Sequence, residues 1–89
     1  MEYDRRITGM VIGQLRTARG MSQEVLSGLS GLARSHLAMI ELGKKSANVD
    51  TLWRIADGLN MRLSDLFRLI EAEHDRRAAN GFSQRNTPC

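Results

Sequence analysis

The segment of residues 20–45 constrains the fold of this chain more than any other part of the sequence. Ser22 is a residue type that caps helix N-termini, and the polar residues that follow it suit the first turn of a helix. Gly31 can supply the left-handed turn that commonly ends a helix. The segment therefore predicts two short helices, over Gln23–Ser30 and about Arg34–Leu42, joined by a tight turn at Gly31.

The rest of the chain carries helical patterns of the same kind. Apolar residues recur at spacings of three and four, the period of an α-helix, and predict further helices over about residues 7–19, 49–59 and 64–79. No alternating apolar pattern occurs, and the only proline is Pro88. We therefore expect an all-α fold of five helices. The helical period of the first helix is set by Ile7, Met10, Val11, Leu15 and Ala18, and the second helix presents one apolar stripe of Val25, Leu26 and Leu29. The side chains expected to face inward are Leu32, Leu37, Ile40, Leu52, Ile55, Ala56, Leu59, Leu66, Phe67 and Ile70.

A chain of 89 residues has the length of one domain. We expect a flexible N-terminus over residues 1–6, one folded domain over residues 7–79 and a flexible tail over residues 80–89. The single cysteine, Cys89, falls in that tail, so the fold does not depend on an internal disulfide. No signal peptide or membrane-spanning run is visible, and the expected location is cytoplasmic.

The charge of the chain favours a polyanionic partner. The formal net charge is +3, and residues 16–45 hold five Lys or Arg residues against two acidic ones. Aromatic residues make up only 4% of the chain, which argues against single-stranded nucleic acid, because such sites stack bases on aromatic rings.

These features resemble the XRE group of bacterial helix-turn-helix regulators, to which the phage lambda repressor and Cro belong. The resemblance covers roughly residues 7–70 and implies a five-helix, lambda-repressor-like domain. In such a domain the second and third helices form the helix-turn-helix, and the third lies in the major groove. The sequence departs from the group's pattern at Ala33, where a capping residue is usual, at Gly28 and Leu29, where exposed polar residues are common, and at Ser30 and Gly58. The matching motifs are Leu15-Arg16, Arg19-Gly20, Ser22-Gln23-Glu24, Gly31, Ile40-Glu41-Leu42-Gly43-Lys44, Asp50-Thr51-Leu52, Ile55-Ala56 and Leu63-Ser64-Asp65-Leu66-Phe67.

Within this resemblance, the outward side of the third helix is the candidate for base contacts, through Arg34, Ser35, His36 and Met39. An arginine can present two donors to guanine O6 and N7, and a methionine can touch a thymine methyl group. The alternative interpretation is that these residues form an ordinary solvated helix face with no binding role.

The candidates for phosphate contact flank that helix. Ser22 and Gln23 stand at the start of the second helix, where free backbone N–H groups attract anions. Lys44 and Lys45 follow the third helix, and their positive charge suits the DNA backbone. Elsewhere, a lysine pair in a loop is most often simply solvated.

The resemblance also implies two structural roles. Arg16 and Glu41 match an arginine and a glutamate that bridge the first and third helices of the group. The dimer surface of the group uses the fifth helix and the loop before it. In this chain a surplus of apolar residues makes that surface the expected homodimer interface: Trp53, Met61, Leu63 and Leu69.

We therefore expect a sequence-specific regulator that binds a pseudo-palindromic operator as a homodimer, such as a repressor, a phage-type regulator or a restriction–modification controller. The alternatives are an antitoxin and a protein-interaction module that retains the fold. No catalytic constellation is visible, so we expect no enzyme, cofactor or small-molecule ligand. His36 and His74 have no further ligand at metal-binding spacing, so we expect no metal.

Overall fold

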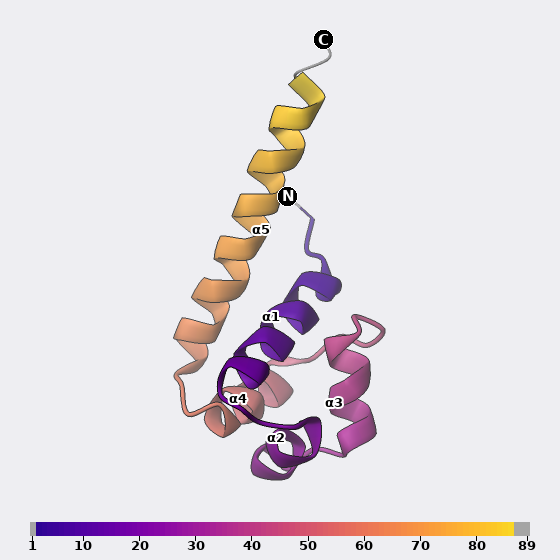
Figure 1. The fold of residues 1–89 in the computed structure, drawn as a ribbon, viewed down its shortest axis with the longest axis vertical. Coiled ribbons are helices and arrows are strands. Elements are labelled where there is room, and N and C mark those ends of the chain that lie inside the picture. The colour runs from indigo at the N-terminus through magenta and orange to yellow at the C-terminus, as the bar shows by residue number, and fades with distance from the viewer. Residues whose placement is uncertain (1, 87–89) are drawn as a thin grey trace.

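The chain folds into five helices. The structure, a computed structural model, describes the backbone of residues 2–86 and the side chains of residues 2–80. No strand occurs within the described residues, and the expected all-α fold of five helices is confirmed (Figure 1). No helix of this part is both long and apolar enough to cross a membrane. The helices are α1 (Arg5–Ala18), α2 (Gln23–Ser30), α3 (Arg34–Glu41), α4 (Val49–Gly58) and α5 (Leu63–Asn86).

Capping side chains and left-handed turns set the ends of the central helices. Ser22 Oγ accepts a hydrogen bond from the Val25 N–H at 3.1 Å, and Asn48 Oδ1 accepts one from the Thr51 N–H at 2.8 Å, so both residues are the expected N-caps. Gly31 ends α2 with a φ of 68°, a value that glycine adopts without steric cost. The predicted bounds of α2, α3 and α4 therefore agree with the structure to within one residue.

The outer helices are longer than predicted. Helix α1 begins at Arg5 rather than at residue 7, because Asp4 Oδ1 accepts a hydrogen bond from the Arg6 N–H at 2.9 Å and caps the helix. Helix α5 was expected to end near residue 79, before Asn80-Gly81, but it continues to Asn86. A glycine inside a helix costs only about 1 kcal/mol, so Gly81 does not by itself end α5. The flexibility of residues 1–6 and 80–89 stays a prediction, and the expected free thiol of Cys89 lies outside the described residues.

The core lies where α1, α2, α3 and α4 converge, with the first half of α5 covering it (Figure 1). Helix α2 packs on α3 and α4, while α1 contacts both α3 and α5. Most of the expected core residues are buried, and Ile12, which the pattern missed, is fully buried as well. The largest fully buried side chains are Ile12, Leu26, Leu37, Ile40, Ile55, Leu59 and Leu66.

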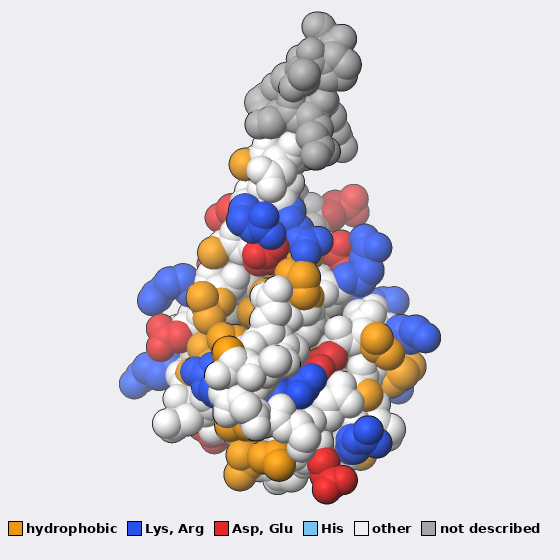
Figure 2. Space-filling view, in the orientation of Figure 1, with side chains coloured by type: hydrophobic (Ala, Val, Ile, Leu, Met, Phe, Trp, Pro, Cys, Tyr) orange, Lys and Arg blue, Asp and Glu red, His pale blue; other side chains and the backbone are white. Residues whose placement is uncertain are grey.

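The expected apolar stripe of α2 is divided: Leu26 is buried, whereas Val25 and Leu29 are exposed. Their residues are 50% and 60% exposed, and Figure 2 shows an apolar patch at the end of the molecule that α2 forms. Helix α2 instead turns Leu26 and its two small serines, Ser27 and Ser30, inward. Small residues let α2 approach α4 closely, so the buried stripe of α2 is only partly apolar.

Three further apolar residues of the predicted helical patterns lie outside the buried core. Ala18 lies at the exposed end of α1, and Phe67 is exposed at the edge of α5. Met10 is half-buried: Arg77 of α5 donates a hydrogen bond to Met10 Sδ at 2.9 Å. Arg77 also pairs with Glu73, and Arg76 and Arg77 together lower the pKa of Glu73 to about 2.

We predict opposite effects of two glycine-to-alanine changes. A Cβ at Gly58 would lie 2.6 Å from Ser30 Oγ and 2.8 Å from Leu26 Cδ1, whereas a Cβ at Gly28 would have no neighbour within 4 Å. Gly28→Ala should raise the free energy of unfolding by about 1 kcal/mol, because alanine favours the helix. Gly58→Ala should lower it by about 1–3 kcal/mol through overpacking. Urea denaturation of both variants checks this, and equal changes of one sign would contradict the packing described here.

Candidate nucleic-acid interface

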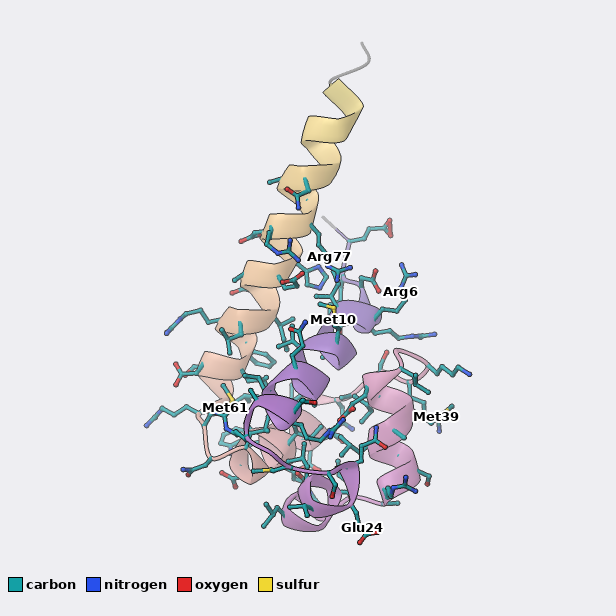
Figure 3. All side chains as sticks on the ribbon, in the orientation of Figure 1. Arg6, Met10, Glu24, Met39, Met61 and Arg77 are labelled. Carbon is teal, nitrogen blue, oxygen red and sulfur yellow. The ribbon has the colours of Figure 1, made fainter. Side chains whose placement is uncertain are left out.

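Helix α3 is held on one side and free on the other. Leu37 and Ile40 are buried in the core, which turns the opposite side of the helix to solvent. Arg34 and Ser35 are exposed there, and the half-buried Met39 lies on the side of α3 that faces away from α1 (Figure 3). The structure thus brings these three predicted base-contact residues onto one accessible face.

His36, the fourth predicted base-contact residue, lies at the margin of this face and is half-buried. The structure adds Ala38 and Leu42 to this face, two residues that were not among the predicted base contacts. They follow Arg34 at helical spacings of four and eight, and Leu42 is 64% exposed. This helical spacing from Arg34 is the sequence signal that could have identified both residues. The face is therefore polar near the start of α3 and apolar near its end.

A buried ion pair fixes α3 against α1. The guanidinium of Arg16 donates from Nε to Glu41 Oε2 at 2.8 Å and from Nη2 to Glu41 Oε1 at 3.0 Å. The two side chains are only 17% and 9% exposed. Hydrogen bonding to Glu41 raises the pKa of Arg16, and the bidentate geometry restricts the relative orientation of the two helices. The structure therefore brings together the two residues expected to form this bridge.

The network reaches α2 as well. Gln23 Nε2 donates to Glu41 Oε1 at 3.0 Å, and Arg16 Nη1 donates to the backbone carbonyl of Met21 at 2.8 Å. Ser22 already caps α2 with its hydroxyl. An anion at this end of α2 would therefore meet the free backbone N–H groups of the first turn. It would also meet the hydrogen-bonding capacity that the Ser22 and Gln23 side chains retain.

The turn after α3 presents two cations to solvent. Gly43 adopts a φ of 76°, and the backbone N–H of Lys44 donates to the Met39 carbonyl at 3.0 Å, which closes the end of α3. Lys44 and Lys45 are both exposed. Among the side chains that the structure describes, neither has a carboxylate partner. Lys and Arg side chains are visible along this edge in Figure 2.

The expected dimer residues lie on a different side, at the junction of α4 and α5. Trp53 is 59% exposed and Leu69 is also exposed, while Met61 and Leu63 are half-buried. Trp53, Met61 and Leu63 line one hollow of about 350 Å³, which Leu69 does not share. Asp57, Arg62 and Ser64 complete its lining, so apolar and polar side chains share this hollow.

We predict that Glu41→Ala is strongly destabilising. The change would leave the half-buried Arg16 guanidinium and the Gln23 amide without their shared acceptor. Breaking a buried pair in this way lowers the free energy of unfolding by about 3–5 kcal/mol. Glu71→Ala, at an exposed position of α5, is the matched control and should change it by less than about 0.5 kcal/mol. Equal, small losses in thermal denaturation of the two variants would contradict the role given to the pair.

Comparison with known proteins agrees with this arrangement. The family described as "HTH_3: Helix-turn-helix" matches residues 12–66. The chain is 39% identical over 64 residues to the HTH-type transcriptional regulator SutR of Escherichia coli (strain K12). The aligned region is 72% of this chain but only 36% of SutR.

Solved structures of similar proteins share the fold. The restriction-modification controller protein C.AhdI from Aeromonas hydrophila superposes with a TM-score of 0.69 at 35% identity, over 71% of this chain and 96% of that chain. The controller protein C.Esp1396I gives a TM-score of 0.74 at 26% identity, over 82% of this chain and 94% of that one. The chain therefore belongs to the HTH_3, or XRE-type, family of helix-turn-helix transcriptional regulators, as the sequence motifs indicated.

Proposed function

We propose that this protein is a sequence-specific regulator of transcription that binds double-stranded DNA through the major groove, as a homodimer on a pseudo-palindromic operator. The observation that carries the proposal is the free face of α3, because its backing is fixed by the buried ion pair of Arg16 and Glu41. A preorganised helix face loses little conformational freedom on binding.

In this proposal α3 reads base edges along its exposed face. Arg34, in the first turn of the helix, is the candidate for a bidentate contact with guanine, because its forked donors match O6 and N7. Ser35 is a candidate for a base or a phosphate, and Met39 for a thymine methyl group. His36 would contact DNA only from the margin of the face.

Phosphate contacts on both sides would set the register of α3 in the groove. At the start of α2, the free backbone N–H groups beside Ser22 and Gln23 would bind a phosphate. In the turn after α3, the exposed ammonium groups of Lys44 and Lys45 would contact the phosphates on the other side. These contacts carry no sequence information, but they supply the salt-dependent part of the affinity.

The homodimer would form through the hollow at the junction of α4 and α5. Trp53 and the neighbouring Met61 and Leu63 line it, and a two-fold axis there would bury the same surface from both chains. Within the family, the similarity to two restriction-modification controller proteins over at least 94% of their chains favours a controller of such genes.

We predict that Arg34→Ala weakens binding to the cognate duplex by about 1–3 kcal/mol and removes discrimination at one base pair, because a bidentate base contact is lost. Lys44→Ala should instead weaken binding to cognate and scrambled duplexes alike and flatten the salt dependence. Titrations of both variants at two salt concentrations, with a cognate duplex taken from an unbiased selection, measure these effects.

The two duplexes also define the outcomes that would contradict this assignment. If Arg34→Ala reduced the affinity for both duplexes by the same factor, Arg34 would be a phosphate contact. If the unaltered protein did not distinguish the cognate duplex from the scrambled one, the proposed function itself would be wrong.

A further inference from the structure

We propose that Arg5, which precedes the family match over residues 12–66, is a further contact to the DNA backbone. It would extend the phosphate-binding surface from the turn after α3 to the first turn of α1. This inference rests on the proposed function. It adds a contact that helix-turn-helix spacing alone does not indicate.

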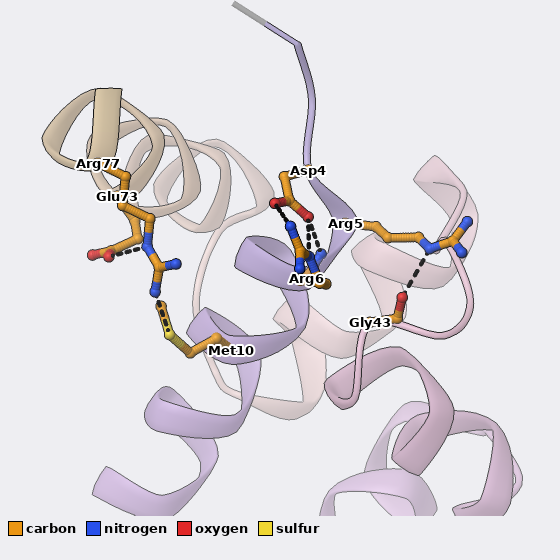
Figure 4. Close-up of polar contacts among 7 residues, drawn as sticks. All are labelled: Asp4, Arg5, Arg6, Met10, Gly43, Glu73 and Arg77. Carbon is orange, nitrogen blue, oxygen red and sulfur yellow. Dashed lines mark hydrogen bonds and ion pairs between the residues drawn. The ribbon is translucent and has the colours of Figure 1, made fainter. Parts of the chain in front are cut away.

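The first turn of α1 abuts the turn that ends α3. Arg5 Nε donates a hydrogen bond to the carbonyl of Gly43 at 2.8 Å, although the two residues are 38 positions apart. A Cβ at Gly43 would lie 2.8 Å from Arg6 Cα, so the two backbones approach closely at this point. In Figure 4 the guanidinium of Arg5 extends past the Gly43 carbonyl. The bond to the Gly43 carbonyl places the Arg5 guanidinium next to the backbone of Lys44.

Tyr3 and Asp4, which precede Arg5, contact the rest of the domain. The Tyr3 hydroxyl donates to Thr8 Oγ1 at 2.7 Å, and the Tyr3 ring stacks on His74 of α5 with a centroid separation of 5.7 Å. Asp4 caps α1. These contacts fix the backbone before Arg5, and the bond to Gly43 restricts the Arg5 side chain itself. A phosphate contact would therefore cost little additional side-chain entropy.

Arg5 also differs from its neighbour in charge balance. The guanidinium of Arg6 binds Asp4, with Nη2 to Oδ2 at 2.9 Å, and this contact lowers the pKa of Asp4 (Figure 4). No carboxylate pairs with Arg5, Lys44 or Lys45 among the residues whose side chains are described. Three cations at one edge without internal counter-charges are a local surplus that a phosphate group would neutralise.

The bond to Gly43 also fits a purely structural role, in which Arg5 satisfies a carbonyl at the end of α3 and so positions that helix. The two roles differ in what a salt titration measures. A phosphate contact contributes about 0.9 to the slope of log Kobs against log salt concentration, whereas a purely structural bond contributes nothing to that slope.

The test is to measure that slope for the unaltered protein, Arg5→Ala, Arg5→Lys and Arg68→Ala on one cognate duplex. Arg68 lies on α5, paired with Asp65 at 3.3 Å, so Arg68→Ala removes the same charge away from α3. We expect Arg5→Ala to reduce the slope by about 1.8, or about 0.9 for each of the two chains on the duplex. Arg5→Lys should keep most of the slope, and Arg68→Ala should leave it unchanged. Circular dichroism verifies that each variant is folded.

A second measurement locates the contact on the DNA. Each duplex of a set carries a single uncharged methylphosphonate at a different phosphate position. At one position this change should weaken binding by the unaltered protein but not binding by Arg5→Ala. The inference is overturned if Arg5→Ala keeps the parent slope, or if Arg5→Ala and Arg68→Ala reduce it equally. Loss of DNA binding by the unaltered protein itself would refute the proposed function instead.

Discussion

The orientation of α3 depends on one buried ion pair. The carboxylate of Glu41 accepts hydrogen bonds from both Arg16 of α1 and Gln23 of α2, so a single side chain joins three helices. In a poorly solvated setting such a network tolerates little displacement, because any unpaired member would be costly. The geometry of the proposed DNA-binding face is therefore set from behind the helix that carries it.

The remaining charges of the molecule fall into two groups. Four described arginines pair with a carboxylate on the same helix: Arg54 with Asp50, Arg68 with Asp65, and Arg76 and Arg77 with Glu73. The cations around the end of α3 have none. Since exposed pairs on one helix contribute little to stability, their main effect here is on the charge distribution. They offset part of the positive charge away from α3, whereas Arg5, Lys44 and Lys45 have no carboxylate pair among the described side chains.

The sequence was sufficient where local chemistry decides the outcome. Capping at Ser22 and Asn48 and the left-handed turn at Gly31 depend on single residue types, and they gave helix bounds close to those observed. It was insufficient where packing decides. Val25 has helical spacing but is exposed, because α2 meets α4 through serines and Gly58. The bond from Arg5 to Gly43 joins distant parts of the chain, so no local pattern could indicate it.

The central claim is that two copies of α3 meet one DNA site with two-fold symmetry. Its most direct test is to select duplexes from a random library and to measure the mass of the complex by light scattering at tens of micromolar protein. The account predicts an inverted repeat whose half-sites are about 10 base pairs, or roughly 34 Å, apart, and two chains bound per duplex. A single half-site bound by one chain, or no enriched sequence, would contradict it.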